Sequence, residues 1–313
     1  MRKIFVLACS LLALLATTAA PAGAGGHAQA ATVLCAAGSE FSSLNRLATS
    51  ASSAAKEWSR DAPERTNIGG SFYDSGIAPN VPDGFEVTVP TYIHVITDGA
   101  VGNVTDDQIE KQMDVLNLSF AGFYGGADSG IRFELEGVTR TDNAAWHTMD
   151  SFADEIAAKQ ALRQGGPDAL NIYVGTAAGN LGFAYYPSIL KYNGKKYAFL
   201  DGAAIHYGSF PDGPIANYNL GFTVTHEVGH WLGLAHTFEQ GCIGHGDYVD
   251  DTPAMSIPSS GCPEGKDSCP LKPGFDPIRN YMDYSYDTCY NQFSPDQAER
   301  MQAQFIHFRT GRY

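Results

Sequence analysis

The segment from His226 to His236 limits the possible folds of this chain more strongly than any other part of the sequence. It reads HEVGHWLGLAH. On a helix, His226 and His230 lie about one turn apart on the same face, so both imidazoles can reach one zinc ion at roughly 2.0 Å. Gly233 permits the left-handed conformation that ends a helix, so the chain can turn and bring His236 back as a third ligand. Three protein ligands leave the fourth position open for water, which is typical of a catalytic zinc site.

Glu227 follows the first histidine, and we predict that it stands beside the metal rather than binding it. The alternative is a buried amphipathic helix whose histidines are ordinary core residues. The short pattern HExxH alone would leave that alternative open, because such motifs recur by chance. The chain contains 34 glycines and 9 histidines among 313 residues, so requiring Gly233 and His236 at fixed offsets reduces chance matches roughly three-hundredfold. The metal site is therefore the favoured interpretation.

Segments on both sides of this motif carry a wider resemblance. The extended motif resembles the metzincin zinc metalloproteases, and its flanks resemble the pappalysin and cytophagalysin-like family, peptidase family M43, over roughly the last two hundred residues. The resembling flanks are residues 219–221, 237–238, 246–253 and 280–284. The resemblance implies that Met282 is the Met-turn residue beneath the zinc and that Tyr284 places its phenol beside the metal.

Hydrophobic patterns and the resemblance together predict an α/β (α+β) fold of the metzincin type, with a catalytic domain at 84–313. Apolar patterns predict strands at 85–96, 131–136, 170–174 and 197–205, a helix after the capping box 105–108, a second helix at 151–164 and a third from Ser294. These elements give a mixed sheet with helices in the N-terminal subdomain, followed by a loop-rich, disulfide-stapled C-terminal subdomain. By resemblance, the last strand before the motif is the antiparallel edge of the cleft, and residues 203–207 are the candidate. His94 and His206 have no partner at ligand spacing, so we interpret them as ordinary histidines.

Together these residues predict a zinc-dependent endopeptidase that acts on proteins or peptides. Glu227 is the expected general base, which takes a proton from the attacking water, and Tyr284 is the expected donor to the developing oxyanion. One catalytic zinc ion would be held by the three histidines. An alternative of another class is a non-catalytic module that captures a peptide in the same cleft without cutting it. Glu227 counts against that alternative, because an inactive descendant of a peptidase often loses the base while keeping the fold.

Residues 1–30 have the pattern of a secretory signal peptide. Arg2 and Lys3 precede an apolar run at 4–15, and small residues continue to Ala30. No later stretch reaches about 18 consecutive apolar residues, so we expect a secreted, extracellular protein without a membrane span.

The negative net charge of the chain limits the kinds of molecule that it is expected to bind. The net charge is −14, and removal of residues 1–30 takes away two basic residues and no acidic ones, which gives −16. Such a surface repels nucleic acid. We expect a monomer whose partners are protein or peptide substrates, with neither nucleic acid nor a membrane as a partner.

Residues 31–83 differ in amino-acid composition from the rest of the chain. They are rich in alanine and serine near 49–55, then read RDAPER at 60–65, and then become rich in glycine and proline. Little of this segment could build a core. We predict a propeptide that is removed near Arg60 or Arg65, with a solvated linker as the alternative.

Four cysteines, at 242, 262, 269 and 289, lie in the loop-rich C-terminal part. Outside the cell they are expected to form disulfides rather than bind metal. Four cysteines allow three pairings, and spacing alone does not choose among them. The family resemblance suggests Cys242 with Cys269 and Cys262 with Cys289.

Cys35 is left over once those four cysteines pair and Cys9 is removed with the signal peptide. The alternatives for a lone thiol are chance or an intermolecular disulfide. A sharper hypothesis is latency, because a thiolate is a good zinc ligand and could occupy the open coordination position in the precursor.

The acidic run at 247–252 suggests a structural calcium ion, because calcium takes several carboxylate and carbonyl oxygens from one loop. The alternative is a solvated acidic loop. The spacing of an EF-hand is absent, so we assign no individual ligands.

Overall fold

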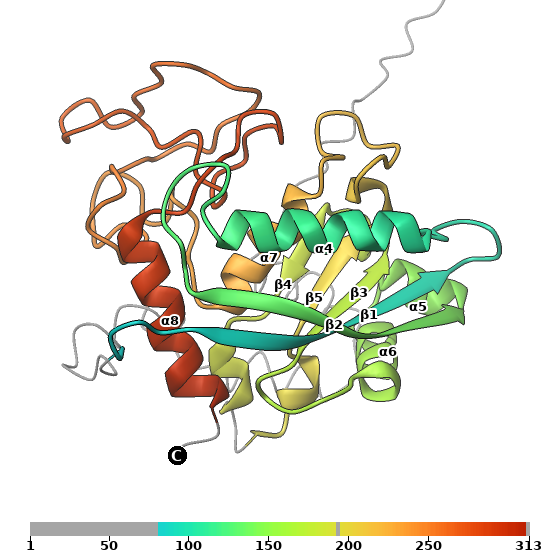
Figure 1. The fold of residues 1–313 in the computed structure, drawn as a ribbon. Helices are drawn as coiled ribbons and strands as arrows, with labels where there is room; N and C mark the ends of the chain where they lie inside the picture. Colours follow the sequence, from blue (N-terminus) through green and yellow to red (C-terminus); the bar gives the residue numbers. More distant parts are fainter. Residues whose placement is uncertain (1–80, 192–194, 311–313) are drawn as a thin grey trace, which may run out of the picture. The chain divides into compact units, whose positions relative to one another are not determined.

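The computed structural model describes residues 81–191 and 195–310. Five strands form one mixed sheet in the order β2-β1-β3-β5-β4 (Figure 1). Their bounds are β1 Val87–Thr97, β2 Ile131–Asp142, β3 Leu170–Gly175, β4 Gly182–Ala184 and β5 Ala203–His206. The pairs β1–β2, β1–β3 and β3–β5 are parallel, and only β4 runs antiparallel to its neighbour β5.

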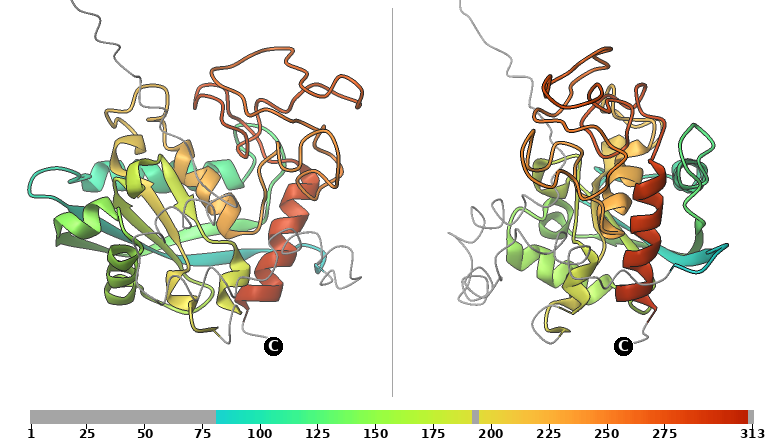
Figure 2. Two further views of the ribbon diagram at one scale, coloured as in Figure 1. Left: turned by 180° about the vertical axis from the view of Figure 1, so that it is seen from behind. Right: turned by 90° about the vertical axis from the view of Figure 1, so that its left-hand side faces the viewer.

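Helices cover both faces of this sheet. Their bounds are α4 Asp106–Phe120, α5 Ala144–Thr148, α6 Phe152–Leu162, α7 Phe222–Trp231 and α8 Pro295–Arg309. Helices α4 and α7 pack together on one face, and α5 and α6 lie on the other, as the view along the sheet in Figure 2 shows. Among the described residues, no helix combines the length and the apolar character needed to cross a membrane.

Alternation along the central strands divides the core between these two faces. Val95 and Val174 belong to the large cluster under α4 and α7, whereas Ile96 and Tyr173 belong to a smaller cluster on the opposite face. This pattern follows from the two-residue period of a strand, which sends neighbouring side chains to opposite sides. The sheet is therefore buried on both faces, as parallel sheets usually are.

Local capping signals place two of the helices as expected. Thr105 caps α4 in a reciprocal box with Gln108, and Ser294 caps α8 in the same way with Gln297. Between α7 and α8 the chain is mostly loop, and this part contains two disulfides. The mixed sheet and the disulfide-linked C-terminal part confirm the predicted fold class.

The predicted edge strand was wrong. Residues 203–206 form β5, an interior strand parallel to β3, and the antiparallel edge is β4. The predicted strand at 197–205 is also shorter than expected, because Ala198–Leu200 forms a 3-10 turn. Strand β4 has only three residues, too few for a two-residue period to be recognised in the sequence. The segments 1–30 and 31–80, including Cys35, lie outside the described residues.

Candidate metal centre

Three histidine side chains converge at the carboxyl end of α7. His226 and His230 come from the helix, His236 follows it, and all three are buried. Their Nε2 atoms lie 3.0 Å apart for His226 and His230 and 3.2 Å apart for His230 and His236. In the described part of the chain, this is the only group of three or more His, Cys, Asp or Glu side chains close enough to share a metal ion.

A tight turn at the end of α7 brings the third histidine into place. Gly233 has φ +95°, and its N–H donates to the carbonyl of His230 at 2.8 Å. The N–H of Leu234 donates to the carbonyl of Gly229 at 2.9 Å. These two bonds form a Schellman motif, which needs a left-handed residue at the position of Gly233. The predicted role of this glycine in ending the helix is therefore observed.

Hydrogen bonds at Nδ1 fix the orientation of both helix histidines. His226 Nδ1 lies 2.6 Å from the carbonyl of Tyr281, and His230 Nδ1 lies 2.7 Å from the carbonyl of Leu234. A carbonyl only accepts, so each Nδ1 carries the proton and each Nε2 presents a bare lone pair. Facing lone pairs at this separation repel each other unless a cation lies between them. Zinc takes imidazole nitrogens at about 2.0–2.1 Å in a tetrahedral arrangement, so the three side chains fit this ion.

Burial also sets the charge of these side chains. Desolvation lowers the pKa of His226 to about 4, against a smaller opposing effect from its hydrogen bond to Tyr281. Desolvation likewise holds the pKa of His230 and of His236 well below 6.5. All three imidazoles are thus neutral near pH 7, and neutral imidazole is the form that binds a metal.

Glu227 is fully buried next to this cluster and lies against the edge strand β4. A Cβ atom placed on Gly182 would come within 2.6 Å of Glu227 Cγ and 2.8 Å of its Oε1. At this distance a Cβ on residue 182 would require Glu227 or the strand to shift, so the glycine allows the backbone of β4 to approach the Glu227 side chain closely. Sequence reasoning missed Gly182, because nothing near it in the chain marks its contact with Glu227.

The hydrogen-bonding pattern of β4 leaves one side of the strand open. His206 donates its N–H to the carbonyl of Leu181 at 2.7 Å, so residues 181 and 183 direct their backbone groups toward β5. In an antiparallel pair, the residues between them point the other way. The backbone groups of Gly182 and Ala184 therefore face the free edge, beside Glu227.

Met282 packs against the helix α7 that carries two of the histidines. Its side chain is fully buried, and a Cβ on Gly229 of α7 would come within 2.5 Å of its sulfur. The carbonyl of Met282 accepts the N–H of Thr237 at 3.2 Å. The backbone carbonyl of the residue before it, Tyr281, accepts the hydrogen bond from His226 Nδ1. Met282, the residue predicted for the Met-turn, is thus joined both to α7 and to the segment that follows His236.

Two side-chain amides support this turn and were not anticipated. Asn280 Oδ1 accepts the N–H of Met282 at 2.9 Å, and Asn280 Nδ2 donates to Gln297 Oε1 at 2.7 Å. Gln297 also closes the capping box of α8. The amide pair therefore joins the Met-turn to the start of the last helix.

The ring of Tyr284 lies next to the histidine cluster. Its centroid lies 5.0 Å from that of His236, 5.8 Å from that of His226 and 4.9 Å from that of Phe238. The side chain is half-buried. The structure therefore brings Tyr284 to the three histidines, places Met282 against Gly229 of the same helix and places Glu227 against Gly182.

Comparison with known proteins identifies the family of this site. The sequence model of peptidase family M43, described as pregnancy-associated plasma protein-A, matches residues 169–306. The chain is 47% identical over 230 residues to an extracellular metalloprotease of Arthroderma benhamiae, covering 72% of this chain and 74% of the relative. It is 48% identical over 228 residues to an extracellular metalloprotease of Colletotrichum graminicola, covering 72% of this chain and 78% of the relative. The chain belongs to peptidase family M43.

Solved structures agree with this assignment. Mirolysin in complex with compound 9 is 31% identical, with a TM-score of 0.63 over 72% of this chain and 93% of mirolysin. A Tannerella forsythia promirolysin mutant is 26% identical, with a TM-score of 0.66 over 87% of this chain and 93% of that chain. This M43 chain is accordingly a zinc metalloendopeptidase.

Two disulfides hold the loop-rich part of this M43 peptidase. They join Cys242 to Cys269 and Cys262 to Cys289, the pairing that the family resemblance implied, and each spans 27 residues. A loop of this length corresponds to roughly 3.5 kcal/mol per bond in the chain-entropy account. The second bond ends five residues after Tyr284, so it helps to fix the loop that carries this ring.

Two carboxylates of the acidic run 247–252 accept hydrogen bonds from protein groups. Thr252 Oγ1 donates to both carboxylate oxygens of Asp247 at 2.7 and 2.8 Å. Asp251 accepts the hydroxyl of Ser294 at 2.6 Å and the N–H of Asp296 at 2.8 Å, at the start of α8. Burial raises the pKa of Asp247 to about 7.

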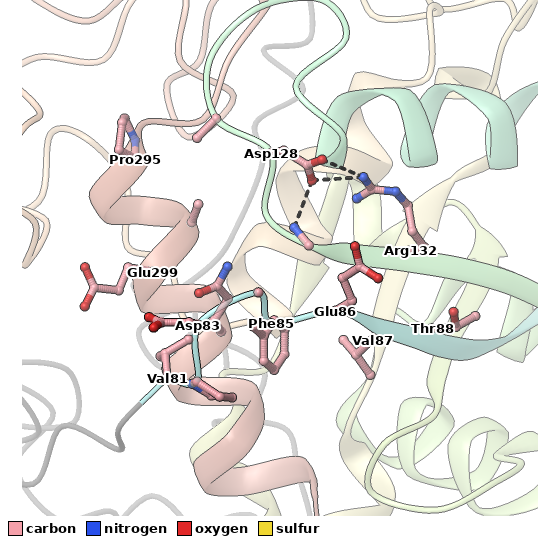
Figure 3. A pocket seen from close by; sticks show the side chains of 16 residues that line it. Val81, Asp83, Phe85, Glu86, Val87, Thr88, Asp128, Arg132, Pro295 and Glu299 are labelled. Atoms are coloured by element: carbon pink, nitrogen blue, oxygen red, sulfur yellow. Dashed lines mark hydrogen bonds and ion pairs between the residues drawn. The ribbon is translucent and has the colours of Figure 1, made fainter.

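A separate open pocket of about 950 Å³ lies between the start of β1, the loop 127–132 and α8 (Figure 3). At its rim, Arg132 Nη2 donates to both carboxylate oxygens of Asp128, at 2.9 and 2.8 Å. No residue of the histidine cluster lines it, and neither Glu227 nor Tyr284 does. The pocket is therefore not part of the peptidase site.

Proposed function

We propose that this chain is a secreted endopeptidase that hydrolyses internal peptide bonds of protein substrates. His226, His230 and His236 hold the zinc ion, which when bound supplies Lewis acidity toward the attacking water and the scissile carbonyl. Glu227 takes a proton from the attacking water and passes it to the leaving amine. Tyr284 donates a hydrogen bond to the oxyanion that develops on the carbonyl oxygen.

One observation carries this proposal: the side chain of Glu227, the residue after His226 in α7, lies against Gly182 of the edge strand β4. An extended peptide can add to such an edge as a further strand, because the N–H and C=O groups of Gly182 and Ala184 face away from β5 and pair with no other strand of the described residues. The bond to be cut would then lie next to the general base. A peptide-complex structure of mature mirolysin, which is 31% identical to this chain, supports peptide binding in this family.

Residues 1–30 and 31–83 fit a signal peptide and a propeptide. The relatives are named extracellular metalloproteases, which supports secretion. The promirolysin alignment covers 87% of this chain, against 72% for mirolysin, which supports a pro-segment before the catalytic domain at 84–313. In that segment Cys35 is the proposed latency thiol.

Three further parts of the proposal concern ions and partners. The loop 247–252 is the proposed site of a structural calcium ion, and added calcium should raise the Tm if an ion binds there. The net charge of −16 that remains after removal of residues 1–30 disfavours binding to nucleic acid, and we propose a monomer that does not bind a membrane. Sedimentation of the mature protein would test the oligomeric state.

Digestion of a peptide library by the mature, zinc-loaded protein tests the proposal, with the cut sites identified by mass spectrometry. We expect cleavage at internal bonds, and we expect a chelator to abolish it. The second candidate, a peptide-binding module without activity, would retain library peptides uncut. That outcome would contradict the proposed function.

A further inference from the structure

Lys159 of α6 has a fully buried side chain on the face of the sheet opposite the zinc helix. Its Nζ atom lies 2.8 Å from Oε1 of Glu155, one turn earlier in the same helix, and donates to the carbonyl of Leu200 at 2.9 Å. Burial lowers the pKa of Lys159, and the charge of Glu155 opposes this effect. A buried ammonium is costly unless partners replace its lost water, so the lysine depends on these two groups.

Three aromatic rings complete the surroundings of this ammonium. Its Nζ atom lies 5.4 Å from the ring centroid of Tyr173, 5.3 Å from that of Phe183 and 4.5 Å from that of Tyr185. At such distances the face of an aromatic ring attracts a cation. The hydroxyl of Tyr185 also donates to Glu155 Oε2 at 3.3 Å. Two of the three rings belong to the edge strand β4 and to the residue that follows it, so the lysine and its partner contact this strand directly.

The register of the sheet makes room for the lysine. Ala204 of β5 is paired with Tyr173 of β3 on one side and with Phe183 of β4 on the other. Directly paired residues point to the same face of a sheet, so these three side chains form one row. The middle of this row holds only a methyl group, and the ammonium contacts the ring on each side of it. The small side chain of Ala204 thus allows Lys159 to reach across the sheet to β4.

The two faces of the segment 182–186 have different neighbours. On one face, Gly182 lies against Glu227, and the ring centroid of Tyr186 is 5.7 Å from that of His230. The odd-numbered residues between them contact the lysine on the other face. This alternation follows the two-residue period of a strand. The edge that we propose to bind the peptide is therefore held between the zinc helix and a buried ion pair.

Stability alone does not explain a lysine at this position. Replacing a buried ion pair by apolar side chains of similar volume often leaves the free energy of unfolding unchanged or increases it. A lysine held at once by a carboxylate, a carbonyl and three rings adds a fixed geometry instead. Addition of a peptide as a further strand needs such a geometry, because the backbone groups of Gly182 and Ala184 must keep their direction to form main-chain hydrogen bonds.

We propose that Lys159, together with Glu155, is a positioning residue for substrate binding: it holds β4 from the face opposite the zinc helix, so that an extended peptide can add to the strand. This inference rests on the proposed function, in which the substrate binds along β4. It requires that loss of the ammonium weakens binding along the strand and leaves the zinc ion in place.

Two peptide substrates test it, with the mature zinc-loaded protein and Lys159→Met. One peptide extends several residues to each side of the cut bond, and the other is truncated close to that bond. The parent should have the higher kcat/KM on the long peptide, because more of it can bind along β4. Lys159→Met should keep one zinc per chain and raise KM for the long peptide about tenfold, which corresponds to the loss of one or two hydrogen bonds. On the truncated peptide its kcat/KM should fall less than about twofold.

Phe183→Leu is the second variant, and it decides the matter if Lys159→Met does not fold. Leucine keeps an apolar side chain on β4 and removes the ring that contacts the ammonium. It should raise KM for the long peptide in the same way, by a smaller factor. Lys266→Met is the matched control, because Lys266 pairs with the buried carboxylate of Asp276 at 3.1 Å within the disulfide-linked loops. It should leave KM for both peptides unchanged.

The possible outcomes separate positioning from a structural role. A structural role would lower the activity on both peptides alike, so equal losses would overturn the inference. An unchanged KM for the long peptide, or loss of zinc from Lys159→Met, would overturn it as well. A parent protein that does not prefer the long peptide would instead refute strand addition to β4, and the inference with it.

Discussion

Gly182 of the edge strand lies against the carboxylate side chain of Glu227, so closely that a Cβ on the glycine would stand 2.6 Å from Glu227 Cγ. The strand that can receive a peptide and the proposed general base therefore occupy adjoining space.

Gly182→Ala should displace Glu227 or the edge strand. A misplacement of about 1 Å in a catalytic site can cost on the order of 10²-fold, so we expect kcat/KM to fall by roughly that factor with zinc retained. Gly137→Ala is the matched control in strand β2, because a Cβ there would meet Tyr92 at 3.5 Å, an ordinary contact. Equal activity of Gly182→Ala and Gly137→Ala would contradict the assigned proximity.

The parts of the site that are contiguous in sequence could be predicted. The spacing from His226 to His236 already requires one helix and one sharp turn, and the observed Schellman motif supplies that turn. The capping boxes at Thr105 and Ser294 were predictable for the same reason, since both partners lie within three residues.

The parts that depend on contacts between distant segments could not be predicted. Strand β4 is too short to show a period, so the edge was assigned to β5 instead. Gly182 and Glu227 are 45 positions apart, and their contact exists only once the sheet and α7 have packed. The hydrogen bond from the N–H of Leu220, just before α7, to Asp287 also joins distant segments. The N-cap residue Gly221 has no side chain that could indicate this contact in the sequence.

Loss of one metal ligand tests the histidine cluster. His236→Ala should abolish peptide hydrolysis and reduce the zinc content measured by mass spectrometry to near zero, because two remaining imidazoles form a much weaker site. His245→Ala is the control, since this nearby histidine is exposed. Retention of stoichiometric zinc by His236→Ala would remove this residue from the ligand set.

The buried carboxyl of Asp247 predicts a pH dependence of stability. Its pKa rises from 3.8 to about 7 on folding, because burial disfavours the charged form. The protonated group therefore favours the folded state, a contribution that is complete below about pH 4 and lost as the pH rises through about 7. Asparagine cannot ionise, so the Tm of Asp247→Asn relative to the parent should rise between about pH 4 and pH 7 and then level off. Thermal denaturation in calcium-free buffer measures it, and a constant Tm difference across this range would refute the prediction.

Latency through Cys35 predicts that the signal-free precursor is inactive until it is cleaved between residues 35 and 85. Cys35→Ala should raise the peptidase activity of the intact precursor without any cleavage, because no thiolate then competes for the zinc. Mass spectrometry of the assayed sample verifies that the chain is intact. If the variant precursor is no more active than the parent precursor, zinc capture by Cys35 is wrong.

The most direct test of the central claim is Glu227→Ala in the mature protein, assayed for zinc content and for peptide hydrolysis together. Glu227 stands beside the three ligands rather than among them, so we expect one zinc per chain to remain. Hydrolysis should fall by about 10³-fold or more, because the general base is lost. Activity near that of the parent, or loss of the zinc, would contradict the proposed mechanism.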